Sequence, residues 1–386
     1  MTIRQGWFSR FAQIRRSESL ISLFSSFLIV LSSHGSLAQE SKTPQPSQQK
    51  PPTHFLDVSP DGTVEVPAQS VPVSSFLSPE AKSYVATHLK DMRDPNATYT
   101  EKGVPRFMMP YLERQKALFP LVMDDTKIAS VHVFVFKPKD GVSQKNSDRV
   151  LIDLHGGGFS GCWPGCGLLE SMPLASLGKI KVISVDYREG PENVFPAASE
   201  DVATVYVELL KKYRPENIGI YGCSAGGGLT TMSIAWFIKH NIPLPGAIGV
   251  FCASAGNIGA GGDSTYFAWP FGEARLAAPP PPTSSNRRTG YFSGTDPKDP
   301  LIAPINSREL LAKFPPTLIV TGTRDFALSG ALYTHSQLVK LGVDAQLHVW
   351  EGLFHGFFYN PDVPESQDAY QVMVRFFDKN LGTHAK

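Results

Sequence analysis

Short apolar runs alternate with amphipathic stretches along most of the chain after about residue 120. The runs are rich in β-branched residues, and turn residues flank most of them, as in strands that are buried on both faces of a sheet. They cover residues 131–136, 149–154, 182–186, 218–221, 247–251, 317–321 and 345–350, and helical patterns lie between them at 198–213, 227–239 and 329–341. The pattern predicts an α/β fold with a mainly parallel central sheet flanked by helices.

Two regions do not follow this alternation. Residues 76–121 are mostly helical in pattern, and residues 255–299 contain a run of four prolines at 279–282. Because insertions at strand ends of such folds commonly cover the pocket, we expect both regions to form a helical cap on one catalytic domain that spans 76–386. The Gly, Pro and Ser content of 255–299 leaves a surface loop as the alternative.

The N-terminal residues have the order of a secretory signal peptide. A basic segment with four arginines precedes an apolar run at 20–31, and the small-residue site Ser36-Leu37-Ala38 follows. The apolar run is shorter than a membrane-spanning helix. We therefore expect residues 1–38 to be removed and the mature protein to be periplasmic or secreted, with no stable membrane span. Twin-arginine export through Arg15-Arg16 and an uncleaved anchor remain alternatives.

Residues 39–75 are rich in Pro, Gln and Ser. Such a composition cannot bury enough apolar surface to offset the entropy of ordering. The segment is expected to be a flexible leader ahead of the catalytic domain.

Composition and charge exclude some partners. The chain has 386 residues, of which 42% are hydrophobic and 18% charged, so it can form a large core. Lys and Arg number 36 and Asp and Glu number 35. This balance creates no net field for nucleic acid or for an anionic membrane surface, and we expect neither as a partner.

A candidate nucleophile follows the predicted strand at 218–221. The segment Gly222-Cys223-Ser224-Ala225-Gly226 lies between that strand and a predicted helix, which is the context of a nucleophile elbow. The sharp turn forces Ser224 into a strained conformation and leaves no room for side chains at Gly222 and Gly226. Alone, the motif is equally compatible with an accidental Gly-rich turn.

A second motif supports the first. His155-Gly156-Gly157-Gly158 directly follows the predicted strand at 149–154, about 70 residues before Ser224, where an oxyanion loop is expected. The backbone N–H groups of this loop, with that of Ala225, can bind the oxyanion of a tetrahedral intermediate, at about 2.7–4 kcal/mol per donor. A mobile glycine loop is the alternative.

An acid and a base follow in the chain order that this fold uses. Asp325 lies just after the predicted strand at 317–321, and His355 lies just after the strand at 345–350. Considered alone, Asp325 fits a helix N-cap and His355 fits a buried core histidine. With Ser224 they form a candidate catalytic triad, in which His355 as base is expected to titrate near the ordinary histidine value of about 6.5.

From about residue 149 to the C-terminus, the chain resembles the hormone-sensitive-lipase-like (family IV) esterases of the α/β-hydrolase fold. The motifs that carry the resemblance are 155–158, Asp186-Tyr187-Arg188 with Pro191-Glu192, 195–198, 222–227, Asp299-Pro300-Leu301, and His355. The resemblance implies hydrolysis of carboxylic esters, usually with short acyl chains, with no metal or organic cofactor. It implies that Ser224 is the nucleophile, His355 the general base, Asp325 the orienting acid, and Gly157, Gly158 and Ala225 the oxyanion donors.

Four positions depart from the family pattern. Cys223 replaces the usual Asp or Thr, and Gly228 replaces a frequent Asn. Phe326 and Ala327 follow Asp325 in place of a more polar turn. These changes put the substrate preference in doubt more than the triad.

The chain has four cysteines. Cys162 and Cys166 flank a turn-favouring Pro-Gly, so they either form a short disulfide in an oxidising compartment or lie unpaired along one helix face. No second pair at ligand spacing accompanies them, so we expect no metal site. Cys223 and Cys252 are expected to be buried free thiols.

Three classes of function remain open. A carboxylic ester hydrolase that acts on a small-molecule ester through an acyl-enzyme is favoured, because nucleophile, base, acid and oxyanion loop are all present. A peptidase or amidase uses the same chemistry on the same fold. A non-catalytic ligand-binding relative is the third class, against which the intact His355 argues.

Overall fold

The computed structural model describes residues 56–101, 103–256, 262–276 and 290–382. The expected signal peptide, residues 39–55 of the leader and the proline run at 279–282 lie outside the described residues. The described part divides into two units. The first ends at Ala68 and contains one antiparallel bridge between Val58 and Val64, and the second begins at Gln69.

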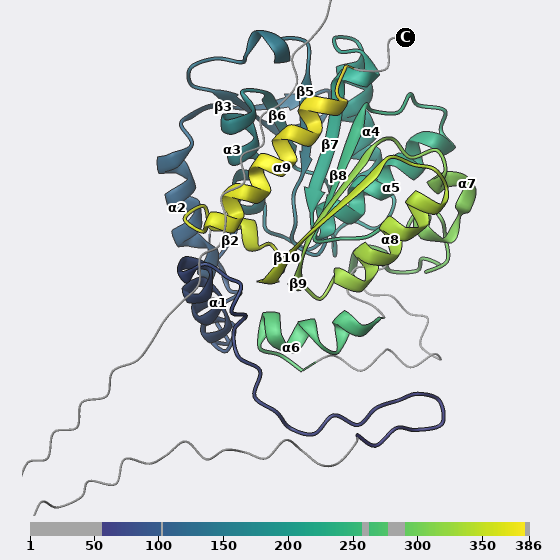
Figure 1. Cartoon of the computed structure of the whole chain (residues 1–386). Coiled ribbons are helices and arrows are strands. Elements are labelled where there is room, and N and C mark those ends of the chain that lie inside the picture. Colours follow the sequence, from purple (N-terminus) through teal and green to yellow (C-terminus); the bar gives the residue numbers. More distant parts are fainter. Residues whose placement is uncertain (1–55, 102, 257–261, 277–289, 383–386) are drawn as a thin grey trace, which may run out of the picture. The chain divides into compact units, whose positions relative to one another are not determined.

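An eight-stranded sheet forms the centre of the second unit (Figure 1). In chain order its strands are β3 (Leu121–Ile128), β4 (Val131–Pro138), β5 (Val150–Leu154), β6 (Lys181–Val185), β7 (Ile218–Cys223), β8 (Ala247–Phe251), β9 (Thr317–Arg324) and β10 (Ala345–Phe354). Their order across the sheet is β10-β9-β8-β7-β5-β6-β4-β3. The neighbouring strands β6, β5, β7, β8, β9 and β10 all pair in parallel. Strand β4 pairs antiparallel with both β6 and β3. The prediction of a mainly parallel sheet flanked by helices is confirmed.

Helices cover both faces of the sheet. Helices α3 (Gly165–Gly178) and α9 (Pro364–Asn380) pack into one hydrophobic cluster, and α4 (Ala197–Leu210), α5 (Ala225–Lys239) and α8 (Leu328–Lys340) pack into the other. Alternate residues of β5 divide between the two clusters: Leu151 joins the first, whereas Ile152 joins the second. Because neighbouring side chains of a strand point to opposite faces, a strand covered on both sides is mostly apolar on both faces. The exception in β5 is Asp153, whose buried carboxylate accepts hydrogen bonds from the hydroxyls of Ser171 and Ser184.

Strand β3 was not predicted from the sequence. Among the strands that the structure describes, β3 pairs only with β4 at the edge of the sheet, and most of its side chains are exposed. An exposed edge strand has no buried face to require apolar residues, so its sequence carries no apolar pattern.

The residues expected to form a cap contain short elements. Helix α1 (Pro79–Asp91), the hairpin β1 (Thr100–Glu101) and β2 (Val104–Pro105), and α2 (Met109–Leu118) lie in the first region, and α6 (Ala268–Glu273) lies in the second. Later in the second region, Tyr291 is buried against Phe159, and its hydroxyl accepts a hydrogen bond from the N–H of Ala198. The four-residue helix α7 (Arg308–Leu311) follows. Among the described residues, no helix is long and apolar enough to cross a membrane.

Candidate active site

The turn between β7 and α5 places Ser224 at the carboxyl edge of the sheet. Ser224 has φ 56° and ψ −119°, a conformation that side-chain-bearing residues rarely adopt. A Cβ added at Gly226 would lie 1.6 Å from the carbonyl oxygen of Leu154, and one at Gly222 would lie 2.2 Å from the same atom. The turn therefore requires both flanking glycines, and Ser224 is held at the N-terminus of α5.

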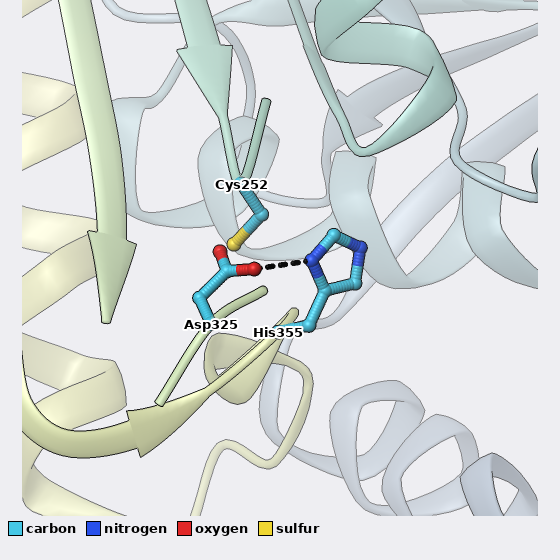
Figure 2. A group of neighbouring side chains, drawn as sticks. All are labelled: Cys252, Asp325 and His355. Atoms are coloured by element: carbon cyan, nitrogen blue, oxygen red, sulfur yellow. Dashed lines mark hydrogen bonds and ion pairs between the residues drawn. The ribbon is translucent and has the colours of Figure 1, made fainter. Parts of the chain in front are cut away.

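Asp325 and His355 come from the ends of β9 and β10 and meet across 30 residues of sequence (Figure 2). Nδ1 of His355 lies 2.8 Å from Oδ1 of Asp325. The other carboxylate oxygen accepts a hydrogen bond from the Thr321 hydroxyl at 2.8 Å, and Oδ1 also accepts one from the N–H of Ala327 at 2.8 Å. Asp325 is 0% exposed, and the His355 side chain is 16% exposed. This network orients the carboxylate, which in turn orients the imidazole.

The charges of this pair are interdependent. Burial by itself would raise the pKa of Asp325, but the His355 imidazolium and the hydrogen bonds to the carboxylate hold it below its usual value. Burial would lower the pKa of His355, but Asp325 raises it to about 9. Nδ1 is held by the acid, so Nε2 is the nitrogen left to exchange a proton.

Ser224 and His355 line the same cavity of about 430 Å³. Gly157, Gly158 and Phe326 also line it, together with Phe107 from the segment between β2 and α2 and Glu273 from α6. No hydrogen bond links Ser224 to His355 in the described part of the chain. Catalytic hydrogen bonds are often long before substrate binds, so the shared cavity is the relevant geometry.

The glycine loop after β5 opens onto this cavity. Gly157 has φ 128° and Gly158 has φ 67°, and a Cβ at Gly157 would lie 1.8 Å from the carbonyl oxygen of Gly161. Only glycine fits at that position. Ala225 is the first residue of α5, where backbone N–H groups are free of intrahelical partners. Two of the three expected oxyanion donors thus belong to residues that line the cavity with Ser224, and the third belongs to the residue that follows Ser224.

His155 supports the loop and does not face the cavity. It is buried, its Nδ1 lies 2.7 Å from the Gly156 carbonyl oxygen, and its ring stacks on Tyr187. The Tyr187 hydroxyl donates to the His155 carbonyl at 2.6 Å. Burial lowers the pKa of His155 to about 4, so it is neutral at physiological pH.

Several residues at the site were not identified from the sequence. They are Thr321, which holds Asp325; Phe326, which stacks on His355; Glu170, which binds the backbone of two catalytic segments; and Glu273, which lines the cavity. None belongs to a local motif. Only the unusual Phe after Asp325 was a signal, as a departure from the family pattern.

Cys162 and Cys166 form a disulfide at the start of α3, and Cys223 and Cys252 are free and buried. Cys252, Asp325 and His355 bring potential ligand atoms within 4.8 Å of one another. Protein contacts account for this grouping without an ion: His355 binds Asp325, and the Cys252 sulfur accepts a hydrogen bond from the N–H of Gly356 at 3.3 Å.

A family model described as alpha/beta hydrolase fold matches residues 151–359. An acetyl-hydrolase of Streptomyces hygroscopicus is 29% identical over 63% of this chain and 79% of its own length. The carboxylesterase/phospholipase LipF of Mycobacterium tuberculosis is 30% identical over 59% of this chain, which spans 61% of LipF.

Solved structures show the same likeness. The esterase E25 has a TM-score of 0.66 and 27% identity, and the alignment covers 82% of this chain and 98% of E25. An esterase from the bacterial hormone-sensitive lipase (HSL) family has a TM-score of 0.64 and 25% identity, over 78% of this chain and 99% of that one.

Proposed function

Because this chain belongs to the α/β-hydrolase family, in its hormone-sensitive-lipase-like branch, and is a serine carboxylesterase, we propose that Ser224, His355 and Asp325 carry its reaction. The observation that supports this assignment most directly is the 2.8 Å contact between His355 and a fully buried Asp325, at the cavity that Ser224 also lines.

In the proposed mechanism, Nε2 of His355 accepts the proton of Ser224 as Oγ attacks the ester carbonyl carbon. The carbonyl π electrons move to oxygen, and the N–H groups of Gly157, Gly158 and Ala225 bind the resulting oxyanion. When the intermediate collapses, the imidazolium returns its proton to the departing alkoxide, and an acyl-Ser224 ester remains. His355 then deprotonates a water molecule as its oxygen attacks the acyl carbon. When this second intermediate collapses, the bond to Ser224 Oγ breaks, His355 returns the proton to Oγ, and the acid is released.

The assignment is tested by removing Ser224 and His355 singly and together. Ser224→Ala and His355→Ala should each lower kcat for p-nitrophenyl butyrate by several powers of ten, and the double variant should cost little more, because the triad acts as a unit. A fluorophosphonate probe should label the wild type and not Ser224→Ala. Strictly additive losses, or labelling that survives Ser224→Ala, would contradict it.

The substrates are proposed to be esters with short acyl chains. The support is the limited cavity volume and the apolar residues Phe107, Met108 and Phe326 that line it beside Ser224. A matched amide of each ester should be cleaved far more slowly, which separates this proposal from an amidase.

Export to the periplasm or the medium is proposed on the N-terminal pattern of basic, apolar and small residues. The Cys162–Cys166 disulfide agrees with an oxidising compartment. N-terminal sequencing of the protein recovered from fractionated cells should begin near Gln39. An intact N-terminus in the membrane fraction would favour an anchor.

A further inference from the structure

Glu273, the last residue of α6, points an acidic group at the substrate cavity. Its side chain is 14% exposed, and it lines the cavity with Ser224 and His355. Among the described residues that line this cavity, Glu273 is the only Asp, Glu, Lys or Arg. It also lies close enough to His355 to raise the pKa of that imidazole, although less than Asp325 does. The cavity therefore carries negative charge beside the reacting groups.

The only polar contact of this carboxylate among the described residues is a weak one. Oε2 of Glu273 lies 3.6 Å from Nε2 of His88, which is too long for a hydrogen bond. His88 is 2% exposed, neither of its ring nitrogens has a hydrogen-bond partner in the described part of the chain, and its ring stacks on Phe354 with centroids 3.6 Å apart. A mostly buried carboxylate without a donor is costly, and a donor from a ligand would recover that free energy.

We propose that Glu273 is a specificity residue for esters that carry a hydroxyl or an ammonium group near the scissile bond. The proposal rests on the proposed ester hydrolysis and names its substrate class. Both groups are attracted to a carboxylate, and both would replace the hydrogen bonds that Glu273 lacks. An ester with its own carboxylate would be repelled. The buried ring of His88 lies near the Glu273 carboxylate and is held in place by stacking on Phe354.

The test compares esters of nearly equal shape. For a hydroxyl on the acyl side, p-nitrophenyl 3-hydroxybutanoate is compared with p-nitrophenyl 3-methylbutanoate. For a hydroxyl on the alcohol side, 2-hydroxyethyl butanoate is compared with propyl butanoate. For a cation, butanoylcholine is compared with 3,3-dimethylbutyl butanoate. The readout is the ratio of kcat/KM within each pair, which cancels any change in the pKa of His355. We expect the wild type to prefer the polar member of at least one pair by about tenfold, the size of a charge-assisted hydrogen bond.

In Glu273→Leu the preference should fall to about one, and in Glu273→Gln it should fall part of the way, since a neutral acceptor remains. Glu113→Gln, which changes an exposed acid of α2 outside the cavity lining, should keep the wild-type ratios. Wild-type ratios near one in all three pairs, or ratios that survive both Glu273 changes, would overturn the proposal. If no ester is hydrolysed in a manner that depends on Ser224, the proposed function fails instead.

A separate observation concerns Glu170 of α3, which is 4% exposed. Its Oε2 accepts a hydrogen bond from the N–H of Cys223 at 2.9 Å, and its Oε1 accepts one from the N–H of Gly156 at 2.9 Å and one from the Tyr359 hydroxyl at 2.7 Å. Gly156 precedes the oxyanion donors, Cys223 precedes the nucleophile, and Tyr359 follows the base. One carboxyl group thus joins three catalytic segments that are far apart in sequence.

The geometry points to Glu170 as a positioning residue that sets the distance between the oxyanion donors and Ser224. The N–H groups of Gly156 and Cys223 each bind a different carboxylate oxygen of Glu170, but glutamine offers only one acceptor oxygen. The NH₂ group of a glutamine side chain would therefore face one of these N–H groups, and two donors cannot form a hydrogen bond. Glu170→Gln should therefore move one segment. A shift of about 1 Å costs up to about a hundredfold in rate.

We expect Glu170→Gln to lower kcat by about ten- to a hundredfold with little change in KM, and to slow fluorophosphonate labelling of Ser224 equally. Ser171→Ala is the matched control, because its buried hydroxyl on the same helix donates to Asp153 and not to a catalytic segment. This variant should melt earlier yet keep kcat. If Glu170→Gln lowered the melting temperature while the folded enzyme retained normal kcat and labelling, its role would be structural alone and the inference would be wrong.

Discussion

The phenyl ring of Phe326 stacks on the imidazole of His355, with ring centroids 4.2 Å apart and planes inclined by 21°. Asp325, the preceding residue, binds the edge of the same imidazole. Two adjacent residues therefore restrain the general base, one by a hydrogen bond and one by covering a face. Phe326 departs from the family pattern, and its ring also meets Trp269 at 4.2 Å, so aromatic groups shield this side of the base.

Replacing Phe326 tests that restraint. Phe326→Ala should lower kcat by about two- to tenfold, the value of an aromatic contact of about 0.5–1.5 kcal/mol, because the imidazole gains freedom and water. Phe326→Tyr keeps the ring and should keep most of the rate. Steady-state kinetics with p-nitrophenyl butyrate give both values, and equal rates for the Ala and Tyr variants would show that stacking is unimportant.

The pH dependence should differ from that expected for an isolated histidine. Asp325 raises the pKa of His355 to about 9 against the effect of burial, and the protonated ring cannot accept the proton of Ser224. The value of kcat/KM should therefore rise with pH through about 9, above the value of about 6.5 that the sequence alone predicts. Rates of Ser224→Ala give the background to subtract.

In Asp325→Asn the midpoint should fall towards 6.5, and the rate should drop by about four powers of ten because the ring adopts the wrong tautomer. A wild-type midpoint near 6.5 would show that Asp325 does not raise the pKa of His355. Near-normal rates in Asp325→Asn would place the acid elsewhere.

Acyl-chain preference should follow the size of the cavity. With about 430 Å³ lined partly by aromatic residues, acyl chains of about two to eight carbons should give the highest kcat/KM across a p-nitrophenyl ester series. A maximum on emulsified long-chain triglycerides would mean that the cavity opens onto lipid, and would indicate a true lipase.

The Cys162–Cys166 disulfide should affect turnover more than stability. It closes a short loop, so its contribution to the unfolding free energy should be small, but it lies directly after the glycine loop, and Cys162 itself lines the cavity. Reduction should lower kcat by up to about a hundredfold while the melting temperature falls by only a few degrees. A Cys162→Ala/Cys166→Ala variant should be insensitive to reductant. Thiol titration of the denatured, unreduced mature protein should find two free thiols. Four free thiols would show that Cys162 and Cys166 are not joined in the mature protein.

His132 should make stability depend on pH. The carboxylates of Asp125 and Asp186 accept hydrogen bonds from the ring nitrogens of His132, at 2.8 and 2.9 Å, and these bonds raise the pKa of His132. Because folding raises the pKa of His132, the protonated ring stabilises the folded state. This stabilisation is complete below the pKa of the unfolded chain, about 6.5, and is lost as the pH rises through the pKa of the folded state. Burial also raises the pKa of Asp186, but carboxyl titration chiefly affects the more acidic range.

Urea unfolding at pH 6 and pH 9 measures this effect. The loss of unfolding free energy in His132→Gln should be larger at pH 6 than at pH 9, and Asp125→Asn should weaken the same dependence. The difference between the losses at pH 6 and pH 9 should shrink in high salt, because the His132–Asp125 ion pair is partly exposed. An equal loss at both pH values would show that the protonated form is not favoured.

The local motifs were readable because each imposes a requirement on a few consecutive residues. A strained Ser224 needs Gly222 and Gly226, whose added Cβ atoms would collide with the Leu154 carbonyl, so sequence alone identified the elbow. Strands buried on both faces are mostly apolar, which made the central strands visible in the sequence, whereas the exposed edge strand β3 has no such constraint. The order of Ser224, Asp325 and His355 along the chain followed from the position of each after a strand.

Tertiary structure alone decided which distant groups share the site. Glu170 and Tyr359 are 189 residues apart, and Glu273 reaches the cavity only because α6 packs beside the ends of β9 and β10. Such contacts depend on how helices pack over the sheet, and a single Glu on a helix has no local pattern that distinguishes it from a solvent-exposed residue. The sequence by itself therefore determined the fold and the candidate reacting groups, while packing decided what holds those groups in place and what charge the substrate meets.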